Sequence, residues 1–241
     1  MNAKVAVVTG ASRGIGLAVA TRLARDGFEV VGCARDLAVQ QHAFAALAAG
    51  ESASWAGRLH ARAADVADED SVAALFASLE RDFGRLDALV NNAGVFDRAP
   101  VTELSAARFD RVMAVNVRGV FLCCREAFRC MAAQPAGGDI VNVSSLAGVP
   151  GVDKFVGTSA YVASKYAVAG LTEQLAAEGR PLGIRVKAVS PGAVATDLLA
   201  GTDHGLQAGM TPAQLAAIIA FLLSDDARPL GGSNIAIFSN A

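Results

Sequence analysis

The chain has 241 residues and a formal net charge of −2; 53% of its residues are hydrophobic and only 18% are charged. This composition excludes an intrinsically disordered chain, which is poor in apolar residues and rich in charge. It also excludes a protein that binds nucleic acid through bulk charge, because no excess of cations is present to neutralise phosphates.

Short apolar runs alternate along the chain with longer segments of helical spacing. Strands are predicted at residues 4–9, 29–33, 58–64, 86–91, 139–144, 184–190 and 234–238. Helices are predicted at residues 14–26, before residue 49, and at 69–83, 105–133, 159–179 and 212–224. Continuous apolar strands are typical of parallel sheets buried on both faces. The order therefore predicts an α/β protein with a doubly wound, seven-stranded parallel sheet and helices on both faces, a single Rossmann-type domain over residues 1–241.

Membrane insertion and secretion are not expected. The longest uncharged run, residues 205–224, contains Gln207, Pro212 and Gln214, and its continuous apolar part is about half a membrane span. Thr211 and Pro212 instead predict an N-cap and first-turn proline of a buried helix. Residues 5–8 are too short for the apolar core of a signal peptide. The cysteines form no disulfide framework, which favours reduced thiols and a cytoplasmic location; they are Cys33, Cys123, Cys124 and Cys130.

A glycine-rich segment follows the first predicted strand and opens the first helix. It reads Thr-Gly-Ala-Ser-Arg-Gly-Ile-Gly over residues 9–16. Gly10 permits a sharp turn, while Gly14 and Gly16 let the backbone approach a pyrophosphate at the positive end of the helix. Glycines also serve ordinary strand-to-helix turns, but the strand-turn-helix context favours a dinucleotide loop.

The residue at the end of the second strand bears on which dinucleotide is bound. NAD-selecting sites usually place a carboxylate there, whereas this chain has Ala34 followed by Arg35. Together with Arg13 in the glycine loop, Arg35 can bind a 2′-phosphate through charge-assisted hydrogen bonds. The sequence therefore predicts a preference for NADP(H). The alternative is that both arginines are solvated surface residues, and Asp36, one position later, weakens the prediction.

Tyr161 and Lys165 are four residues apart on a predicted helix and therefore share one face. A phenol has an ordinary pKa of about 10, which a neighbouring ammonium lowers toward the range of proton transfer near neutrality. The pair by itself is a weak signal, since Tyr166 shows that tyrosine also occurs here without such a partner.

These motifs, taken in order, resemble the classical short-chain dehydrogenase/reductase (SDR) family. Residues 9–16 match its Thr-Gly-x-x-x-Gly-x-Gly pattern at every fixed position, and the resemblance runs from about residue 3 to residue 200. Further matches are Asp65-Val66, Asn91-Asn92-Ala93-Gly94, Asn116, Ser144-Ser145, Tyr161 with Lys165, and Pro191-Gly192-Ala193-Val194-Ala195-Thr196.

The resemblance implies hydride transfer between a nicotinamide and a carbonyl or secondary alcohol substrate. It implies that Tyr161 exchanges a proton with the substrate oxygen, that Ser145 orients this oxygen, and that Lys165 lowers the tyrosine pKa and holds the nicotinamide ribose. Asn116 would support a proton-relay water. From the residues alone, Ser145 would be a turn serine and Asn116 a helix-kink asparagine. The cofactor-binding residues implied are Gly10, Ser12, Arg13, Gly14, Ile15, Gly16, Arg35, Asp65, Val66, Asn92, Ala93, Gly94, Tyr161, Lys165, Pro191, Gly192, Val194 and Thr196.

Two segments depart from the family layout, and we expect both to shape the substrate site. Residues 147–160 form an insertion-like loop beside Ser145, and residues 197–210 form a short loop that carries His204, expected to be a surface residue. The ending at Phe238-Ser239-Asn240 also departs from the family pattern, so a tetramer is less strongly implied than a homodimer. Cys123, Cys124 and Phe128 are candidates for the dimer contact or for the core.

Three functional hypotheses follow. The first is an NADP(H)-dependent carbonyl reductase or alcohol dehydrogenase whose small-molecule substrate, direction and stereochemistry the sequence does not define. A narrower alternative is a 3-oxoacyl-(acyl-carrier-protein) reductase, with Arg125 and Arg129 as docking residues. A third is an NADP(H)-binding sensor without catalysis, which the intact catalytic residues disfavour. No metal site is predicted, because His42, His60 and His204 have no ligand-like spacing with the cysteines.

Overall fold

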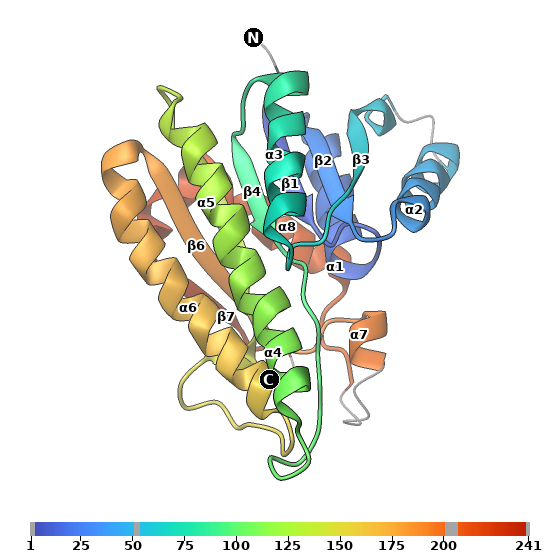
Figure 1. Cartoon of the computed structure of the whole chain (residues 1–241). Coiled ribbons are helices and arrows are strands. Elements are labelled where there is room, and N and C mark those ends of the chain that lie inside the picture. Colours follow the sequence, from blue (N-terminus) through green and yellow to red (C-terminus); the bar gives the residue numbers. More distant parts are fainter. Residues whose placement is uncertain (1–2, 51–53, 201–206, 240–241) are drawn as a thin grey trace.

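The apolar runs of the sequence form the strands of one parallel sheet. A computed structural model describes residues 3–50, 54–200 and 207–239, and its described residues form a seven-stranded sheet in the order β3-β2-β1-β4-β5-β6-β7 (Figure 1). Each neighbouring pair is parallel. The strands are β1 (Val5–Thr9), β2 (Glu29–Ala34), β3 (Leu59–Ala63), β4 (Ala88–Asn91), β5 (Gly138–Val143), β6 (Ile184–Pro191) and β7 (Asn234–Ile237). The predicted doubly wound Rossmann fold is confirmed.

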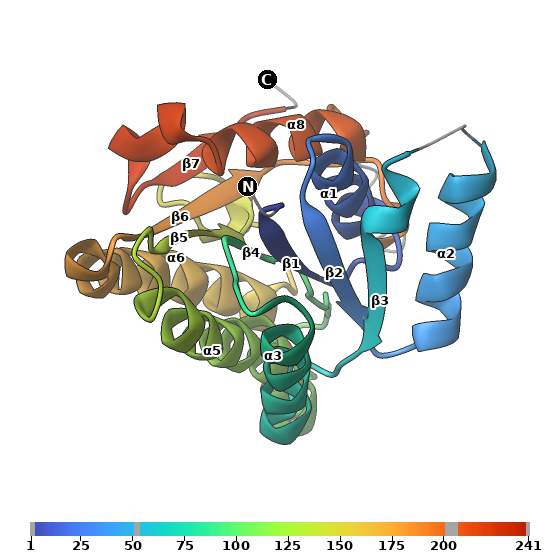
Figure 2. The same cartoon turned by 90° about the horizontal axis from the view of Figure 1, so that it is seen from above.

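Helices cover both faces of the sheet, as Figure 2 shows from above. They are α1 (Gly14–Arg25), α2 (Leu37–Gly50), α3 (Glu69–Phe83), α4 (Ala106–Met113), α5 (Gly119–Ala132), α6 (Ser159–Gly179), α7 (Asp197–Ala200) and α8 (Pro212–Leu222). One buried apolar cluster joins α3, α5 and α6 to the sheet, and a second joins α1, α8 and Phe44 of α2 to the opposite face. The core therefore lies in two layers, one on each side of the strands.

Several local signals are confirmed in these layers. Thr211 caps α8 by accepting a hydrogen bond from the Gln214 backbone N–H, and Pro212 occupies the first turn. Cys123 and Cys124 are fully buried in the core, and the partly buried Phe128 packs against the same cluster. None of the helices in the described ranges combines the length and apolar character needed to cross a bilayer.

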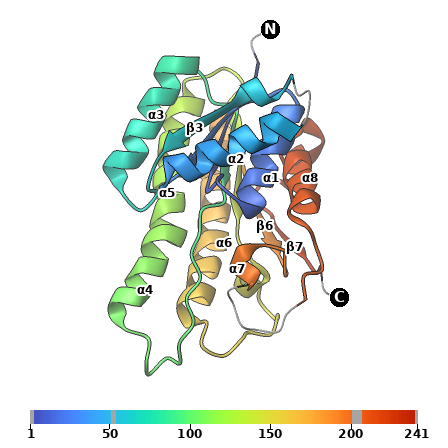
Figure 3. The same ribbon diagram turned by 90° about the vertical axis from the view of Figure 1, so that its right-hand side faces the viewer.

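The long helix predicted over residues 105–133 is interrupted, which corrects the sequence analysis. α4 and α5 lie in one line, as Figure 3 shows, but residues 114–118 between them form a π-helical turn that contains Asn116. The Asn116 amide pairs with the backbone of Val95, accepting from its N–H at 2.8 Å and donating to its carbonyl at 2.9 Å. π-Helical turns inside α-helices occur frequently at functional sites, and this one ties the helix to the segment that follows β4.

The strand order reverses direction between β1 and β4. Chain connections run outward from β1 to β2 and β3 on one side, and from β4 to β5, β6 and β7 on the other. In open parallel sheets such a switch point opens a crevice beyond the carboxyl ends of the strands, where ligands bind. The side chains singled out in the sequence are concentrated at this end of the sheet.

Candidate active site

A single cleft of about 1170 Å³ runs along the carboxyl ends of the strands. Every residue predicted to bind cofactor contributes to its lining except Gly16, which lies beneath the loop that lines it. Ser145, Tyr161 and Lys165 also line this cleft, whereas Asn116 is buried behind it. The structure thus brings the residues selected by sequence into one site.

The glycine loop is shaped so that the main chain itself forms one wall of the cleft. Gly10 has a φ of +68°, a conformation that favours glycine, and its N–H donates to the Cys33 carbonyl at 2.8 Å. A Cβ on Gly16 would lie 2.1 Å from the Gly10 oxygen and 2.5 Å from Nδ2 of Asn92. This close packing brings the N-terminus of α1 against the cleft, and its free N–H groups suit a pyrophosphate. The loop therefore fits a dinucleotide.

The Asn-Asn-Ala-Gly motif after β4 is fastened to the same loop. The Thr9 hydroxyl accepts hydrogen bonds from the N–H groups of Asn92 and Ala93, both at 3.0 Å. The Asn92 amide donates in turn to the carbonyls of Thr9 at 3.0 Å and Gly10 at 3.2 Å. These bonds fix the two central strand ends relative to each other, so the motif holds the shape of the cofactor cleft.

Ser145, Tyr161 and Lys165 are brought together where β5 meets α6. Ser145 begins the short 3₁₀ turn Leu146–Gly148, and a Cβ on Gly148 would lie 2.5 Å from the Lys165 backbone, so this turn sits directly on α6. The Ser144 hydroxyl donates to the Lys165 carbonyl at 3.0 Å and fastens the strand end to the same point.

The Lys165 ammonium lies beneath the Tyr161 ring. Its Nζ donates to the Val143 carbonyl at 3.0 Å and is 5.5 Å from the ring centroid of Tyr161. The other side of the tyrosine meets Phe96 in an edge-to-face contact with 5.1 Å between the centroids. Phe96 was not selected from the sequence, although an aromatic residue two positions after Asn-Asn-Ala-Gly is a usable signal.

Burial is the largest influence on the pKa values of both Tyr161 and Lys165. It raises the pKa of Tyr161 above 10.0, and a hydrogen bond with Ser145 opposes that rise. It lowers the pKa of Lys165 from 10.5 to about 8. The pKa of Tyr161 is therefore shifted upward, whereas a neighbouring ammonium alone would lower it. The tyrosine therefore carries its proton near neutrality, and Lys165 is within reach of titration there.

Asn116 supports the site from behind. Besides its pairing with Val95, its amide donates to the Ser164 hydroxyl at 3.1 Å. Both side-chain N–H groups are thus given to protein acceptors. A Cβ on Gly94 would lie 3.4 Å from Asn116 Oδ1 and 4.0 Å from Lys165 Nζ, so both side chains lie close to Gly94. The Asn116 amide positions the segment after β4 and the helix that carries Tyr161.

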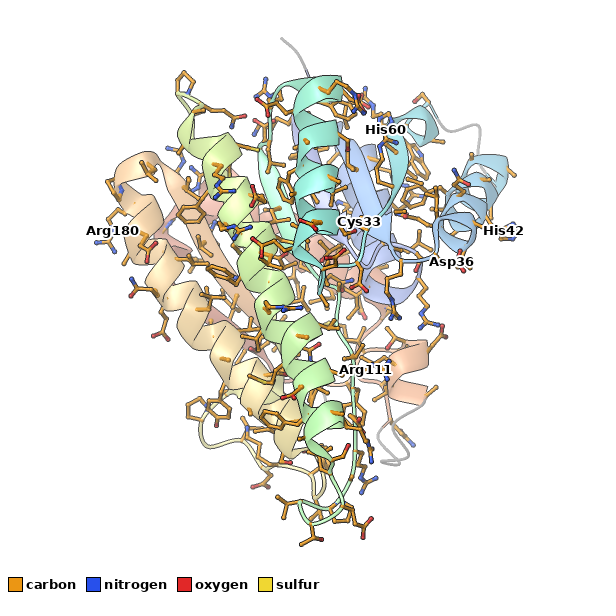
Figure 4. All side chains as sticks on the ribbon, in the orientation of Figure 1. Cys33, Asp36, His42, His60, Arg111 and Arg180 are labelled. Atoms are coloured by element: carbon orange, nitrogen blue, oxygen red, sulfur yellow. The ribbon has the colours of Figure 1, made fainter. Side chains whose placement is uncertain are left out.

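The cleft is also lined by the residues expected to decide between NAD(H) and NADP(H). Ala34, Arg35 and Arg13 all line it. The Nη1 of Arg13 lies 3.7 Å from Oδ2 of Asp197 on α7, and both side chains are largely exposed to solvent. Asp36, labelled in Figure 4, accepts a hydrogen bond from the Val39 N–H at 3.0 Å and so serves the first turn of α2.

Asp65 also lines the cleft. Its Oδ1 accepts from the Ala67 N–H at 2.9 Å, and its own N–H donates to the Ser71 hydroxyl at 3.0 Å. These bonds fix the turn after β3 where it lines the cleft.

Among the described residues no group of three or more His, Cys, Asp or Glu side chains is arranged to hold a metal ion. His60 lies on β3 with its Nε2 2.8 Å from a Glu29 carboxylate oxygen, and His42 lies on α2 (Figure 4). His204 lies outside the described residues.

Comparison with known proteins agrees with this geometry. The family model described as short chain dehydrogenase matches residues 4–207. The chain belongs to this family. A 3beta-hydroxysteroid dehydrogenase of Mediterraneibacter gnavus is 37% identical to this SDR chain, with 97% of the chain and 92% of the relative covered. A cis-4-hydroxycyclohexanecarboxylate dehydrogenase of Sinomonas cyclohexanicum is 41% identical, with 97% and 94% covered.

Solved structures show the same relationship. A 3-ketoacyl-(acyl-carrier-protein) reductase from Brucella melitensis, complexed with NADH, superposes with a TM-score of 0.85 at 34% identity, covering 97% of this chain and 96% of that one. This SDR is therefore an oxidoreductase of hydroxyl and carbonyl groups that binds a nicotinamide cofactor.

Proposed function

We propose that this SDR interconverts a ring ketone and the corresponding secondary alcohol, with NADP(H) as the preferred cofactor. The observation that carries the proposal is the apolar wall of the cleft that Ser145 and Tyr161 also line. This wall is formed by Val95, Phe96, Leu146, Val152, Phe155, Leu198 and Leu199. Apolar walls with a few polar groups at the reacting centre suit a compact apolar substrate. Two relatives named for hydroxysteroid and hydroxycyclohexane substrates support a ring.

The chain's own groups perform the proton chemistry in this proposal. The cofactor, when bound, supplies or accepts the hydride. Tyr161 keeps its proton near neutrality because burial raises its pKa, so its hydroxyl donates to the carbonyl oxygen in reduction. Ser145 hydrogen-bonds and orients the same oxygen. The Lys165 ammonium stabilises the phenolate that remains after proton transfer. The reverse reaction uses the same groups with the proton moving the other way.

The preference for NADP(H) rests on the end of β2. Ala34 offers no carboxylate to the ribose, and Arg13 and Arg35 both line the cleft. The Asp36 carboxylate accepts a hydrogen bond from the Val39 N–H at the start of α2. This contact argues against a second role for Asp36 in binding the ribose hydroxyls of NAD(H). The NADH-bound relative means that membership of the family does not decide this choice. We expect Arg35→Asp to raise the Kd for NADPH at least about tenfold while leaving that for NADH within about threefold.

A 3-oxoacyl-(acyl-carrier-protein) reductase is the second candidate, favoured by the solved relative of that name. Arg125 and Arg129, the residues expected to dock the carrier protein, are less suited to that role in this structure. Arg125 lies 2.8 Å from Glu69 and 2.9 Å from Glu126, and Arg129 lies 2.8 Å from the same Glu126. Both arginines are thus paired with carboxylates of their own chain and offer less positive charge to an acidic carrier.

The test is turnover of a substrate panel, followed by the absorbance of the reduced cofactor. Purified protein is given NADPH or NADH with cyclohexanone derivatives, open-chain ketones and a 3-oxoacyl thioester on a carrier protein. The proposal predicts the highest kcat/KM for a ring ketone with NADPH. Faster reduction of the carrier thioester supports the second candidate, and cofactor binding without turnover of any member supports a nucleotide sensor.

A further inference from the structure

Lys154 lies in the insertion-like loop, and its ammonium donates hydrogen bonds to two backbone carbonyls near it. Within the insertion-like segment of residues 147–160, the part that lies between the turn at Leu146–Gly148 and α6, residues 149–158, is called the insertion loop. The Nζ of Lys154 donates to the Val149 carbonyl at 2.7 Å and to the Leu146 carbonyl at 3.1 Å. It also lies 5.3 Å from the ring centroid of Tyr166 on α6, whose hydroxyl donates to the same Val149 carbonyl at 3.2 Å. One ammonium thus joins the start of the loop, the 3₁₀ turn Leu146–Gly148 that follows Ser145 (called the catalytic turn below) and α6.

The catalytic turn has its own supports, so the effect of Lys154 falls mainly on the loop beyond it. The Ser145 hydroxyl accepts from the Ala147 N–H at 3.2 Å, and Gly148 is packed against the Lys165 backbone. These contacts fix the turn from inside the fold. The Val149 N–H donates to the Leu146 carbonyl at 3.1 Å, and from this residue onward Lys154 and Tyr166 add contacts from outside the turn.

The far end of the insertion loop is fastened to a different element. The Val156 carbonyl accepts from Nε of Arg98 at 3.2 Å, and the Gly157 carbonyl accepts from the Ala99 N–H at 2.9 Å. The loop therefore spans the distance from the catalytic turn to the segment after β4, at the lower end of the molecule in Figure 1. Between these two attachments, Val152 and Phe155 contribute to the cleft.

We propose that Lys154 is a positioning residue for substrate recognition: its ammonium fixes the insertion loop so that Val152 and Phe155 form the wall against which the substrate ring packs. This inference rests on the proposed function and adds a determinant of substrate affinity to it. Because Ser145, Tyr161 and Lys165 keep their own supports, loss of the ammonium should weaken substrate binding more than the chemical step.

The decisive experiment compares Lys154→Met with wild type on a neutral ring ketone at saturating NADPH. The expected result is an increase in KM of about tenfold with kcat within about threefold and an unchanged Kd for NADPH. Lys154→Arg should restore much of the affinity, because a guanidinium can donate to both carbonyls and stack on Tyr166. Lys4→Met is the matched control, since Lys4 is an exposed lysine placed over Phe28, and no change is expected there.

Two outcomes would overturn the positioning role. The first is a loss confined to a carboxylated ring ketone with the neutral ketone unaffected, which would mean that the ammonium binds substrate directly. The second is an equal fall of kcat and kcat/KM with unchanged KM, which would place its effect on the chemical step.

Amide hydrogen exchange separates this inference from the proposed function. Exchange of the backbone amides in residues 149–158 should be faster in Lys154→Met than in wild type, with no substrate present. If wild type reduces no ring ketone but exchange still accelerates, the proposed function fails while the anchoring of the loop stands. Unchanged exchange in Lys154→Met overturns the inference whatever the activity.

Discussion

Replacing Lys165 with Met should make the folded protein more stable at pH 7 while removing its activity. Lys165 is buried, and burial lowers its pKa from 10.5 to about 8. At pH 7 most of the folded molecules therefore carry a buried ammonium that would be better solvated in the unfolded chain. Methionine has a similar length and carries no charge, so it removes that cost.

The magnitude follows from the two pKa values. A tenfold change in proton affinity is worth about 1.4 kcal/mol, so the difference between 10.5 and about 8 corresponds to about 3 kcal/mol of folding free energy. The variant also loses the hydrogen bond from Nζ to the Val143 carbonyl, worth about 1–2 kcal/mol. The net expectation at pH 7 is a gain of about 1–2 kcal/mol in the free energy of unfolding.

The sign of the pH dependence can be stated from the same values. Between pH 8 and 10.5 the unfolded chain binds the lysine proton more tightly than the folded chain, so this group makes stability rise with pH. The cost is fully present below pH 8 and is relieved as the pH approaches 10.5. The advantage of Lys165→Met should therefore shrink by about 2–3 kcal/mol between pH 7 and pH 10.

Urea denaturation of wild type and variant at several pH values measures this difference. The difference is the correct readout, because burial also raises the pKa of Cys33 to about 12 and of Tyr161 above its ordinary value, and both effects oppose the lysine at high pH. The cysteine contribution cancels between the two proteins. Measuring both in a Tyr161→Phe background removes the contribution of the tyrosine, whose ring centroid lies 5.5 Å from Lys165 Nζ. A variant that is less stable than wild type at pH 7, by an amount that does not change with pH, would refute the reasoning.

Two further predictions concern packing. Gly16→Ala should cost about 1–3 kcal/mol of stability and abolish cofactor binding, because its Cβ would lie 2.1 Å from the Gly10 oxygen; Gly57→Ala, with nothing within 4 Å, is the control. Chemical denaturation and NADPH titration test this, and a Gly16→Ala protein that binds NADPH normally would contradict it. Gln40 is fully buried and its amide atoms have no hydrogen-bond partner among the described residues, so Gln40→Met should stabilise the fold by about 1 kcal/mol. A lower melting temperature of Gln40→Met would show that the amide is satisfied.

The sheet was predictable because most of its strands are largely apolar runs, although β3 alternates apolar residues with His60 and Arg62. The cofactor loop was predictable because its glycines have a strand before them and a helix after them. The interruption at residues 114–118 was not, since apolar spacing continues through Val115 and Val117 and the π-helical turn involves Asn116 pairing with Val95 across the fold. A helical period carries no information about such a distant partner.

The substrate wall was located only approximately from sequence. The insertion-like segment was recognised by its length, but the role of Lys154 depends on which carbonyls the folded backbone brings within reach of its ammonium. Phe96 likewise acquires its role from the ring of Tyr161, which lies 65 residues further along the chain. Motifs therefore predicted the groups expected to act on the reacting oxygen, while the groups proposed to shape the substrate site required the three-dimensional arrangement.

The most direct test of the account is the turnover of a ring ketone by wild type and Tyr161→Phe with NADPH. Phenylalanine keeps the ring against Phe96 and above Lys165 but removes the hydroxyl that donates the proton. We predict that kcat falls at least about a hundredfold while the Kd for NADPH stays within about threefold. Undiminished turnover by Tyr161→Phe would contradict the assignment of Tyr161 as the proton donor.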